Sequence, residues 1–557
     1  MTVAATAAEV GPNPPAAARA GRRARQRAGI GSVAVAVVLL LVAVPVAAVV
    51  LRTVRPHGEW DPEAFGRVLS SARTWRLVAV TVGQALGSSV LTVAVGVPVA
   101  WVLSRFRFRG RDALASAAVV PFVLPSVVVG SAFATLLGPR GLVDLRGTWW
   151  PILAAHACFN LAVVVRTVGA ALDGLPPDME AAGRLLGAGP VGVARRLLLP
   201  AVAPAIAAAA TITFLFCLTS FGVIVILGGG RVSTVEVEIW TRATRQFDLP
   251  GAGVLAMLQL AAVVATLTVH ARISRHAARA TAGSPGTRRQ RPRAWRDRAV
   301  VAAAVLVVAA VSVAPLLALV ERSLRVGDRL GLDHWTGLGS AAAGTGLAVS
   351  PLTAVATSLG AAFVATAASV LLALPATRAV ARRPGGLGDR LLLLPLGVSA
   401  TTIGLGLLLA VGRPPIDLRR SVWIVPVAQA LVAIPLVVRT VLPSLRALPG
   451  TMLDAAATLG ATPRARWWRV ELPLLRRPVV AGAGLALVAC LGEFGATVFV
   501  ARQDRPTVPV AIERLMSRPG GAGFGQAMAL SCVLAAVCAV VVVALDRWVG
   551  GETGPTF

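Results

Sequence analysis

Two stretches of this sequence decide its fold: LPPDMEAAGRLLGAGPVGVARRLLLP at 175–200 and LPGTMLDAAATLGATPRARWWRVELP at 448–473. Each is a Gly-, Pro- and Arg-bearing segment between long apolar runs. The two share a Leu-Pro at both ends, a Met, a Leu-Gly-Ala and a following Pro in one register. A single shift along the chain, here called the repeat offset, places Leu175 on Leu448 and aligns all of them. Agreement at so many positions indicates a duplicated unit.

The composition of the chain is that of a membrane protein. It is 56% hydrophobic and only 14% charged, with a mean hydropathy of +0.76, far more apolar than an average soluble domain. Runs of about 20 apolar residues are long enough to cross a bilayer core of roughly 30 Å as a helix. Twelve spans are predicted: 30–51, 77–103, 113–137, 149–170, 200–228, 251–271, 298–320, 352–377, 391–411, 422–443, 479–500 and 526–547.

The repeat offset continues on both sides of the two stretches. Without a gap it aligns short identical strings: RTV at 166–168 with 439–441, FG at 221–222 with 494–495, and TV at 234–235 with 507–508. The chain is therefore predicted to consist of two homologous halves. Six helices in each half make them parallel repeats that both enter the membrane from the cytoplasm.

The net charge of +29 comes from 54 arginines and no lysine, a balance that in a soluble protein would suggest nucleic acid. The distribution of the arginines argues against that partner. With a cytoplasmic N-terminus they concentrate on the cytoplasmic side, above all in 19–27, 105–111 and 272–298, as the positive-inside rule requires. We therefore expect no nucleic-acid partner, a lipid bilayer around the chain, and both termini in the cytoplasm.

These observations predict an all-α polytopic membrane protein with about 12 transmembrane helices in two homologous six-helix halves. The predicted domains are a disordered cytoplasmic tail at 1–29, a first half at 30–271 with its core at 77–271, an Arg-rich cytoplasmic linker at 272–297, a second half at 298–547 with its core at 352–547, and a cytoplasmic tail at 548–557.

Each of the two quoted stretches follows the fourth span of its half, on the cytoplasmic side. Its Leu-Pro starts a short helix, because Pro is tolerated in a first helical turn, and Asp178 and Glu180 suit a helix N-terminus. Gly187 suits a left-handed helix end. The run 191–200 is then a second, amphipathic helix. A plain connector would explain one such loop, but two copies in register argue against it.

The two loops resemble the EAA loop of ATP-binding-cassette importer permeases of the type I fold. The pattern is an acidic residue, Ala-Ala, three residues and Gly, with a Leu-Pro a dozen residues later. The matching residues are Ala181, Ala182, Gly183 and Gly187 in the first copy, and Asp454, Ala455, Ala456 and Gly460 in the second. The acidic position of the family aligns with Asp454 in the second copy but with Ala181 in the first, where Glu180 stands one residue earlier.

The resemblance covers 77–271 and 352–547, and it is nearest to the fused permeases for ferric iron and thiamine, in which one chain carries both halves. It implies that each loop forms a coupling helix that docks on a separate cytoplasmic ATPase dimer. It also implies an external substrate-binding lipoprotein, a bacterial cell membrane, and thiamine or ferric iron as the cargo, in that order.

The missing lysine bears on the energy source. A P-loop needs a Lys that reaches the β and γ phosphates of the nucleotide. Because the chain contains no Lys, it cannot carry a Walker A site, and any ATP must bind a partner subunit. The chain itself is predicted to hold no cofactor and no metal, and to be no enzyme.

Three polar residues inside predicted spans are candidates for the translocation path, because polar groups in a membrane are costly. His156 and Asn160 lie one turn apart on one helix face, and Glu493 stands where the first half has Ser220. Each has a structural alternative: hydrogen bonds between helices for His156 and Asn160, and an ion pair with an Arg for Glu493.

The leading prediction is thus a transmembrane permease subunit of an ATP-driven, binding-protein-dependent importer. The alternative is a proton-coupled secondary carrier of the major-facilitator type, which also has twelve helices in two parallel halves. The paired loops and the lack of a membrane-embedded acid–base relay argue against that carrier. A membrane enzyme is weakened by the lack of a catalytic set of residues.

Overall fold

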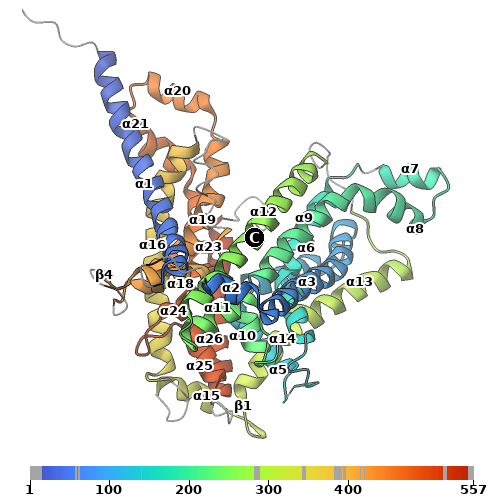
Figure 1. The fold of residues 1–557 in the computed structure, drawn as a ribbon. Helices are drawn as coiled ribbons and strands as arrows, with labels where there is room; N and C mark the ends of the chain where they lie inside the picture. Colours follow the sequence, from blue (N-terminus) through green and yellow to red (C-terminus); the bar gives the residue numbers. More distant parts are fainter. Residues whose placement is uncertain are drawn as a thin grey trace, which may run out of the picture.

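The computed structural model describes residues 16–549, apart from 57–58, 60–62, 140, 177, 281–288, 341–346, 382–391, 393–396, 414–415, 419–420 and 518–522. Over these residues it is built of helices (Figure 1). Its strands form two short antiparallel hairpins, β1 (Arg325–Val326) with β2 (Arg329–Leu330) and β3 (Gly412–Arg413) with β4 (Ile416–Asp417). The predicted all-α class is confirmed.

The first half runs from α1 to α12. Its helices are α1 (Ala16–Val54), α2 (Glu63–Leu69), α3 (Ala72–Arg105), α4 (Arg111–Val123), α5 (Ser126–Leu136), α6 (Trp150–Asp173), α7 (Met179–Leu185), α8 (Pro190–Val193), the π-helical turn η1 (Ala194–Leu198), α9 (Leu199–Leu218), α10 (Gly222–Leu227), α11 (Val235–Thr244) and α12 (Leu249–Ala280).

The second half runs from α13 to α26. Its helices are α13 (Trp295–Val308), the π-helical turn η2 (Ala309–Val313), α14 (Ala314–Leu324), α15 (Asp333–Thr336), the 3-10 turn η3 (Gly337–Gly339), α16 (Pro351–Ala381), α18 (Ala400–Ala410), α19 (Ile424–Arg446), α20 (Gly450–Thr458), α21 (Pro463–Arg466), the π-helical turn η5 (Trp467–Glu471), α22 (Leu472–Leu474), α23 (Arg476–Gly492), α24 (Thr497–Val500), α25 (Val508–Met516) and α26 (Phe524–Val549).

The helices of the two halves correspond at the repeat offset found in the sequence. α3 corresponds to α16, α5 to α18, α6 to α19, α7 to α20, α9 to α23, α11 to α25 and α12 to α26. The duplication read from two loops therefore extends through both halves, and the prediction of two homologous halves is confirmed.

Nine helices among the described residues are long and apolar enough to cross a membrane, and eleven spans result when each of two sharply bent helix pairs is one span. Most of the predicted spans coincide with these helices within a few residues. The predicted span 391–411 is described at 392 and at 397–411, which include α18, and the remaining residues 391 and 393–396 lie outside the described residues.

The predicted span 113–137 is not one straight helix. α4 and α5 meet there at an angle of 108°. The break falls at Leu124-Pro125, where Leu124 is extended at φ −72° and ψ 145°. Pro lacks an N–H and disfavours the helical conformation in the residue before it, so the apolar run cannot continue as one helix.

Two further predicted spans end early. Span 200–228 stops at Leu218, the end of α9, and span 479–500 stops at Gly492, the end of α23. Each chain then turns before the short helices α10 and α24. The two breaks lie at equivalent places, next to the Phe-Gly pairs at 221–222 and 494–495, so they belong to the duplicated design.

The predicted tail and linker are partly helical. α1 begins at Ala16, within the predicted tail 1–29, and the Ala, Arg and Gln of residues 16–29 favour helix. α12 extends into the predicted linker 272–297 as far as Ala280, and α13 begins at Trp295. Residues 1–15, 281–288 and 550–557 lie outside the described residues.

The first span of each half packs against the other half. α1 lies along α16 and α18, and the span formed by α13, η2 and α14 lies against α3, α4 and α5. Figure 1 shows α1, in blue, among the yellow and orange helices of the second half. Each half therefore buries apolar surface that belongs to the other.

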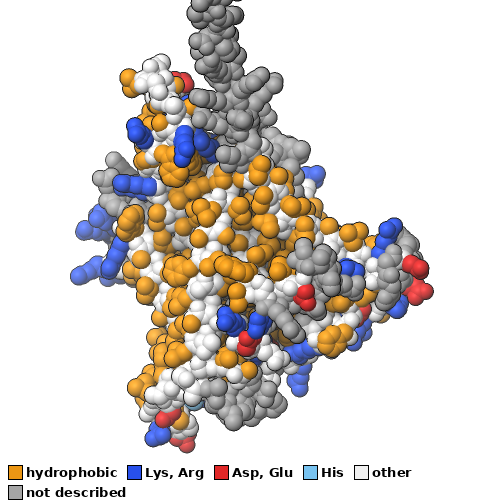
Figure 2. Space-filling model, turned by 90° about the vertical axis from the view of Figure 1, so that its left-hand side faces the viewer, with side chains coloured by type: hydrophobic (Ala, Val, Ile, Leu, Met, Phe, Trp, Pro, Cys, Tyr) orange, Lys and Arg blue, Asp and Glu red, His pale blue; other side chains and the backbone are white. Residues whose placement is uncertain are grey.

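The outer surface is that of a protein in lipid. Hydrophobic side chains cover the broad middle of the face shown in Figure 2. On α16 alone, Leu352, Phe363 and Leu371 are 50, 60 and 73% exposed. So much exposed apolar surface is stable only where lipid covers it, so the chain is a multi-pass membrane protein.

Candidate functional site: the paired loops and the contact between the halves

The two loops found in the sequence lie at the far ends of two diverging groups of helices, here called the arms (Figure 1). The first arm consists of α3, α6 and α9, and the second consists of α16, α19 and α23. In each, a short helix, α7 or α20, is followed by a turn and by a second helix that leads back to its arm. The predicted sequence of helix, Gly turn and helix is present in both halves.

Both short helices end in the same hydrogen-bonded turn. In the first loop Gly187 has a φ of +82°, and its N–H donates to the Arg184 carbonyl at 2.9 Å. The N–H of Ala188 donates to the Gly183 carbonyl at 3.1 Å. The second loop repeats both bonds, at 3.0 Å each, around Gly460 with its φ of +81°. This is the Schellman arrangement, whose left-handed residue is best supplied by Gly.

Gly183 allows the two helices of the first loop to touch. A Cβ added there would lie 2.6 Å from Cδ1 of Leu197 and 3.2 Å from Cγ2 of Val193. In the second loop the equivalent residue is Ala456, which is partly exposed. The first loop is therefore the more tightly packed of the two.

The other predicted loop residues face outward. Ala181, Ala182, Asp454 and Ala455 are exposed. Beside them three leucines, Leu185, Leu186 and Leu459, are each 88% exposed. Each loop therefore presents exposed apolar side chains at the end of its short helix.

Glu180 differs from this exposed set. Its side chain is 25% exposed and pairs with Arg105, at the end of α3, and with Arg184 at 3.2 Å. The first acidic group of the loop therefore points to its own arm, whereas Asp454 of the second loop is exposed.

A π-helical turn follows each loop helix in the same register. η1 ends at Leu198 and η5 ends at Glu471, its equivalent at the repeat offset. Such turns are rare in proteins, and those that occur often lie at functional sites. The sequence predicted an ordinary amphipathic helix there, because a π turn leaves no signal in apolar periodicity.

The two halves meet through equivalent phenylalanines. The rings of Phe221 and Phe494, which occupy the same position in the two halves, have their centroids 5.0 Å apart, and their residues are 6% and 2% exposed. Equivalent residues that touch must lie next to the approximate twofold axis between the halves. Gly222 leaves room for this contact, because a Cβ there would lie 2.5 Å from Ser126 Oγ and 3.4 Å from Phe494 Cδ1.

Further contacts between the halves surround the phenylalanine pair. The Thr401 hydroxyl on α18 donates to the buried Glu236 carboxylate on α11, and the guanidinium of Arg245 lies 3.9 Å from the carboxylate of Glu513 on α25. α5, α10, α11, α24 and α25 all lie away from the loops (Figure 1). In this structure the halves are thus in contact at the end opposite the loops.

His156 and Asn160 lie between helices of the first half. The His156 ring is hydrogen-bonded to Ser88 Oγ on α3 at 2.9 Å and to Ser220 Oγ at 2.8 Å. Asn160 Nδ2 donates to the His156 carbonyl at 3.0 Å and to Cys217 Sγ at 3.5 Å. Both residues are buried, so their contacts favour the structural interpretation over path lining.

Glu493 caps a helix. Its carboxylate oxygens accept the N–H groups of Ala496 at 2.7 Å and Thr497 at 2.9 Å, at the start of α24. The predicted ion pair with an Arg is absent among the described residues, and backbone donors take its place. This also favours a structural role over cation attraction.

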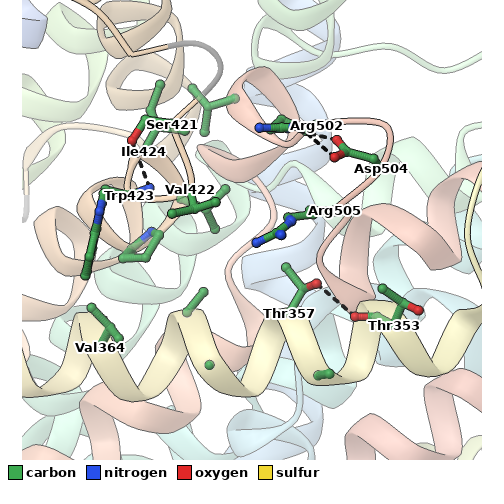
Figure 3. Close-up of a pocket in the computed structure, with 16 residues that line it drawn as sticks. Thr353, Thr357, Val364, Ser421, Val422, Trp423, Ile424, Arg502, Asp504 and Arg505 are labelled. Atoms are coloured by element: carbon green, nitrogen blue, oxygen red, sulfur yellow. Dashed lines mark hydrogen bonds and ion pairs between the residues drawn. The ribbon is translucent and has the colours of Figure 1, made fainter.

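A pocket of about 720 Å³ lies elsewhere, within the second half. Figure 3 shows Thr353 and Thr357 on one face of α16, across from the loop that carries Arg502, Asp504 and Arg505. Arg502 pairs with Asp504 at 2.6 Å, and this hydrogen bond lowers the pKa of the Asp504 carboxyl. None of the predicted path residues lines this pocket, and it does not lie between the halves.

These features define a class of protein. Two equivalent membrane-spanning halves close on each other at one end and present a matched pair of loops at the other. The part of the chain that the structure describes contains no cluster of side chains able to hold a metal. This is the architecture of a transport protein.

The family follows from the sequence itself. The family model described as binding-protein-dependent transport system inner membrane component matches residues 92–279 and 365–550. The starts of the two matches correspond at the repeat offset, and together the matches cover more than half of the chain. The chain belongs to this family, and it is a permease subunit of an ABC importer.

Several curated relatives are similar. A thiamine transport system permease protein of Brucella abortus is 26% identical over 85% of this chain and 87% of its own length. A sulfate transport system permease protein of Salmonella typhimurium is 30% identical over 39% of this chain and 82% of its own. A probable molybdenum ABC transporter permease protein of Haloferax volcanii is 33% identical over 41% of this chain and 84% of its own.

Proposed function

We propose that this permease forms the whole substrate path of an ATP-driven importer and is moved by a separate ATPase dimer that docks on its two loops. An external binding protein delivers the substrate at the opposite end. When ATP draws the two ATPase subunits together, the loops follow, and the arms rock about the phenylalanine contact to expose the path alternately.

The observation that carries this proposal is the matched pair of loop helices. Both end in the same glycine turn, both present a leucine that is 88% exposed, and they lie at the ends of the two arms. A partner with two equal subunits would place one subunit on each of the two equivalent loops. The lack of any Lys in the chain supports the location of the ATP site on that partner.

The orientation that fits this proposal places the loops and both termini in the cytoplasm. The support is the distribution of arginines, which are concentrated in 105–111 and in the linker between the halves. In a bacterial cell the phenylalanine contact then faces the outside, where the binding lipoprotein docks.

Thiamine is the proposed cargo. The thiamine permease of Brucella abortus resembles this chain over 85% of its length, across both halves, whereas the sulfate and molybdenum permeases match 39% and 41% of it. With binding protein and ATPase in proteoliposomes, labelled thiamine should accumulate and unlabelled sulfate or molybdate should not compete. Uptake of sulfate without thiamine would contradict this cargo, as would uptake of ferric iron alone.

The loop glycines provide a test of docking. Gly187→Ala combined with Gly460→Ala places a side chain at two left-handed positions, which costs roughly 1–2 kcal/mol per residue and should weaken ATPase binding by about 5- to 30-fold per loop. The measurement is co-purification of the ATPase with the permease, together with ATP-driven uptake.

Two glycines of the same loops supply the control. Gly189→Ala and Gly450→Ala place a Cβ in open space at positions without positive φ, so binding should stay near that of the parent protein. If uptake instead ignores ATP depletion and collapses with the proton gradient, the chain behaves as a secondary carrier and the proposal fails.

A further inference from the structure

Equivalent arginines stand at the loop-side ends of equivalent helices. Arg105 is the last residue of α3, and Arg378, its equivalent at the repeat offset, lies in the last turn of α16. Both side chains are largely buried, with 19% and 26% of their surface exposed. Each points away from solvent toward the loop of its own half.

In the first half the arginine binds the loop helix itself. Arg105 Nη1 donates to Glu180 Oε1, in the first turn of α7, and the other oxygen of Glu180 accepts from Arg184 at 3.2 Å. The guanidinium carbon of Arg105 lies 5.3 Å from the centroid of the Trp101 ring, which holds the charge on an aromatic face. α7 is thereby tied to α3.

In the second half the arginine binds the helix that returns from the loop. Arg378 Nε and Nη2 donate to the two oxygens of Glu471, at 3.0 and 2.9 Å, and Nη2 reaches the Pro463 carbonyl at 3.4 Å. The Glu471 side chain is 4% exposed and also pairs with Arg466 at 3.3 Å. The guanidinium of Arg378 lies 4.5 Å from the Trp467 ring centroid.

The two acids are not equivalent, although the two arginines are. At the repeat offset, Glu180 aligns with Leu453 and Glu471 aligns with Leu198. In each half, the equivalent arginine therefore pairs with a glutamate, but this glutamate lies on a different helix in the two halves. Because the two halves form this arginine–glutamate pair with different glutamates, the pair itself matters. It also explains why the acidic residue of the first loop, Glu180, stands one residue earlier than the acidic position of the family.

We propose that Arg105 and Arg378 are positioning residues that transmit loop movement to α3 and α16. The proposal rests on the proposed function, in which the ATPase moves the loops. A loop held to its arm only by its two covalent ends can swing on them, whereas an arginine–carboxylate pair fixes distance and angle at a third point. The first coupling helix is tied directly, and the second is tied through its return helix.

The test uses the full permease with its ATPase and binding protein in proteoliposomes, and it measures substrate transported per ATP hydrolysed. Arg105→Gln and Arg378→Gln should leave the ATPase bound and active while transport per ATP falls about tenfold, within the usual range of coupling between sites. The double variant Arg105→Glu with Glu180→Arg restores the pair in reverse and should recover at least half of the loss.

A second variant addresses folding. Arg378→Gln leaves Glu471 buried without its forked partner, which can destabilise the protein. Arg378→Met with Glu471→Met replaces both charges by apolar chains of similar length, so the protein should fold and still be uncoupled. Arg146→Gln, which breaks an exposed pair with Asp144 far from the loops, is the matched control and should be silent.

The outcomes separate the two proposals. If wild-type transport is ATP-driven and the Met pair or Arg105→Gln transports as many molecules per ATP as wild type, the link is not needed and the inference is overturned. Loss of transport in strict proportion to loss of ATPase binding also overturns it, since that is a docking defect. If wild type binds no ATPase, the proposed function fails and this inference fails with it.

Discussion

At the scale of single residues, the contact between Phe221 and Phe494 joins the two halves, and in the proposed mechanism it closes the outer end of the path. An aromatic pair contributes about 0.5–1.5 kcal/mol beyond its buried area, so Phe494→Ala should shift the balance from closed to open by roughly 2- to 12-fold. The expected result is leakage of substrate through proteoliposomes without ATP.

The control for that variant is Phe122→Ala. Phe122 also belongs to an aromatic cluster, with Phe159 and Phe216, but it is 37% exposed and lies within one half. The loss of its ring should cause no leakage of substrate through the proteoliposomes. Equal leakage from both variants would show that the Phe221–Phe494 contact does not close the path.

Glu493 gives a second prediction at this scale. Because its carboxylate caps α24, Glu493→Ala should cost about 0.5–2 kcal/mol, the usual value of a helix cap, whereas Glu493→Gln keeps an acceptor and should cost less. Thermal unfolding in detergent measures this. The KM for uptake should be unchanged in Glu493→Gln. A large rise in KM with unchanged stability would instead support attraction of a cationic substrate.

At the scale of elements, the features that could be predicted from the sequence are those that depend on residues close together along the chain. Gly187 was predicted as a left-handed helix end because that requirement is local, and its φ value of +82° confirms it. Gly460, its equivalent at the repeat offset, was not predicted in this role and has a φ of +81°. The break at Pro125 was missed because a continuous apolar run hid it. The Phe221–Phe494 and Arg105–Glu180 contacts depend on packing between distant helices, although the repeat offset had already aligned Phe221 with Phe494.

The break between α4 and α5 is itself a testable element. Pro125→Ala restores an N–H and frees Leu124 to become helical, so the 108° bend should relax. Pro125 also touches the other half, since a Cβ on Gly492 would lie 3.1 Å from its ring. Straightening should therefore loosen the contact between halves and lower the melting temperature. An unchanged melting curve and unchanged uptake would show that the bend does not depend on Pro125.

At the scale of the whole molecule, the first span of each half packs against the other half, so the two halves depend on each other for stability. α1 packs on α16 and α18, and α14 packs on α5, so a chain cut between 280 and 289 should reassemble only when both pieces are made together. A tag on one piece should then recover the other with transport intact. Stable, monodisperse halves expressed separately would contradict this.

The central claim is that ATP moves the two loops toward each other. Gly189 and Gly450 lie in the two loops and have open space for a side chain, so spin labels attached at Gly189→Cys and Gly450→Cys would report on the arms directly. In the complete transporter, the distance measured by electron–electron resonance should shorten when the partner ATPase binds ATP and lengthen again after hydrolysis. A distance that stays constant through the ATP cycle while substrate is imported would contradict the account.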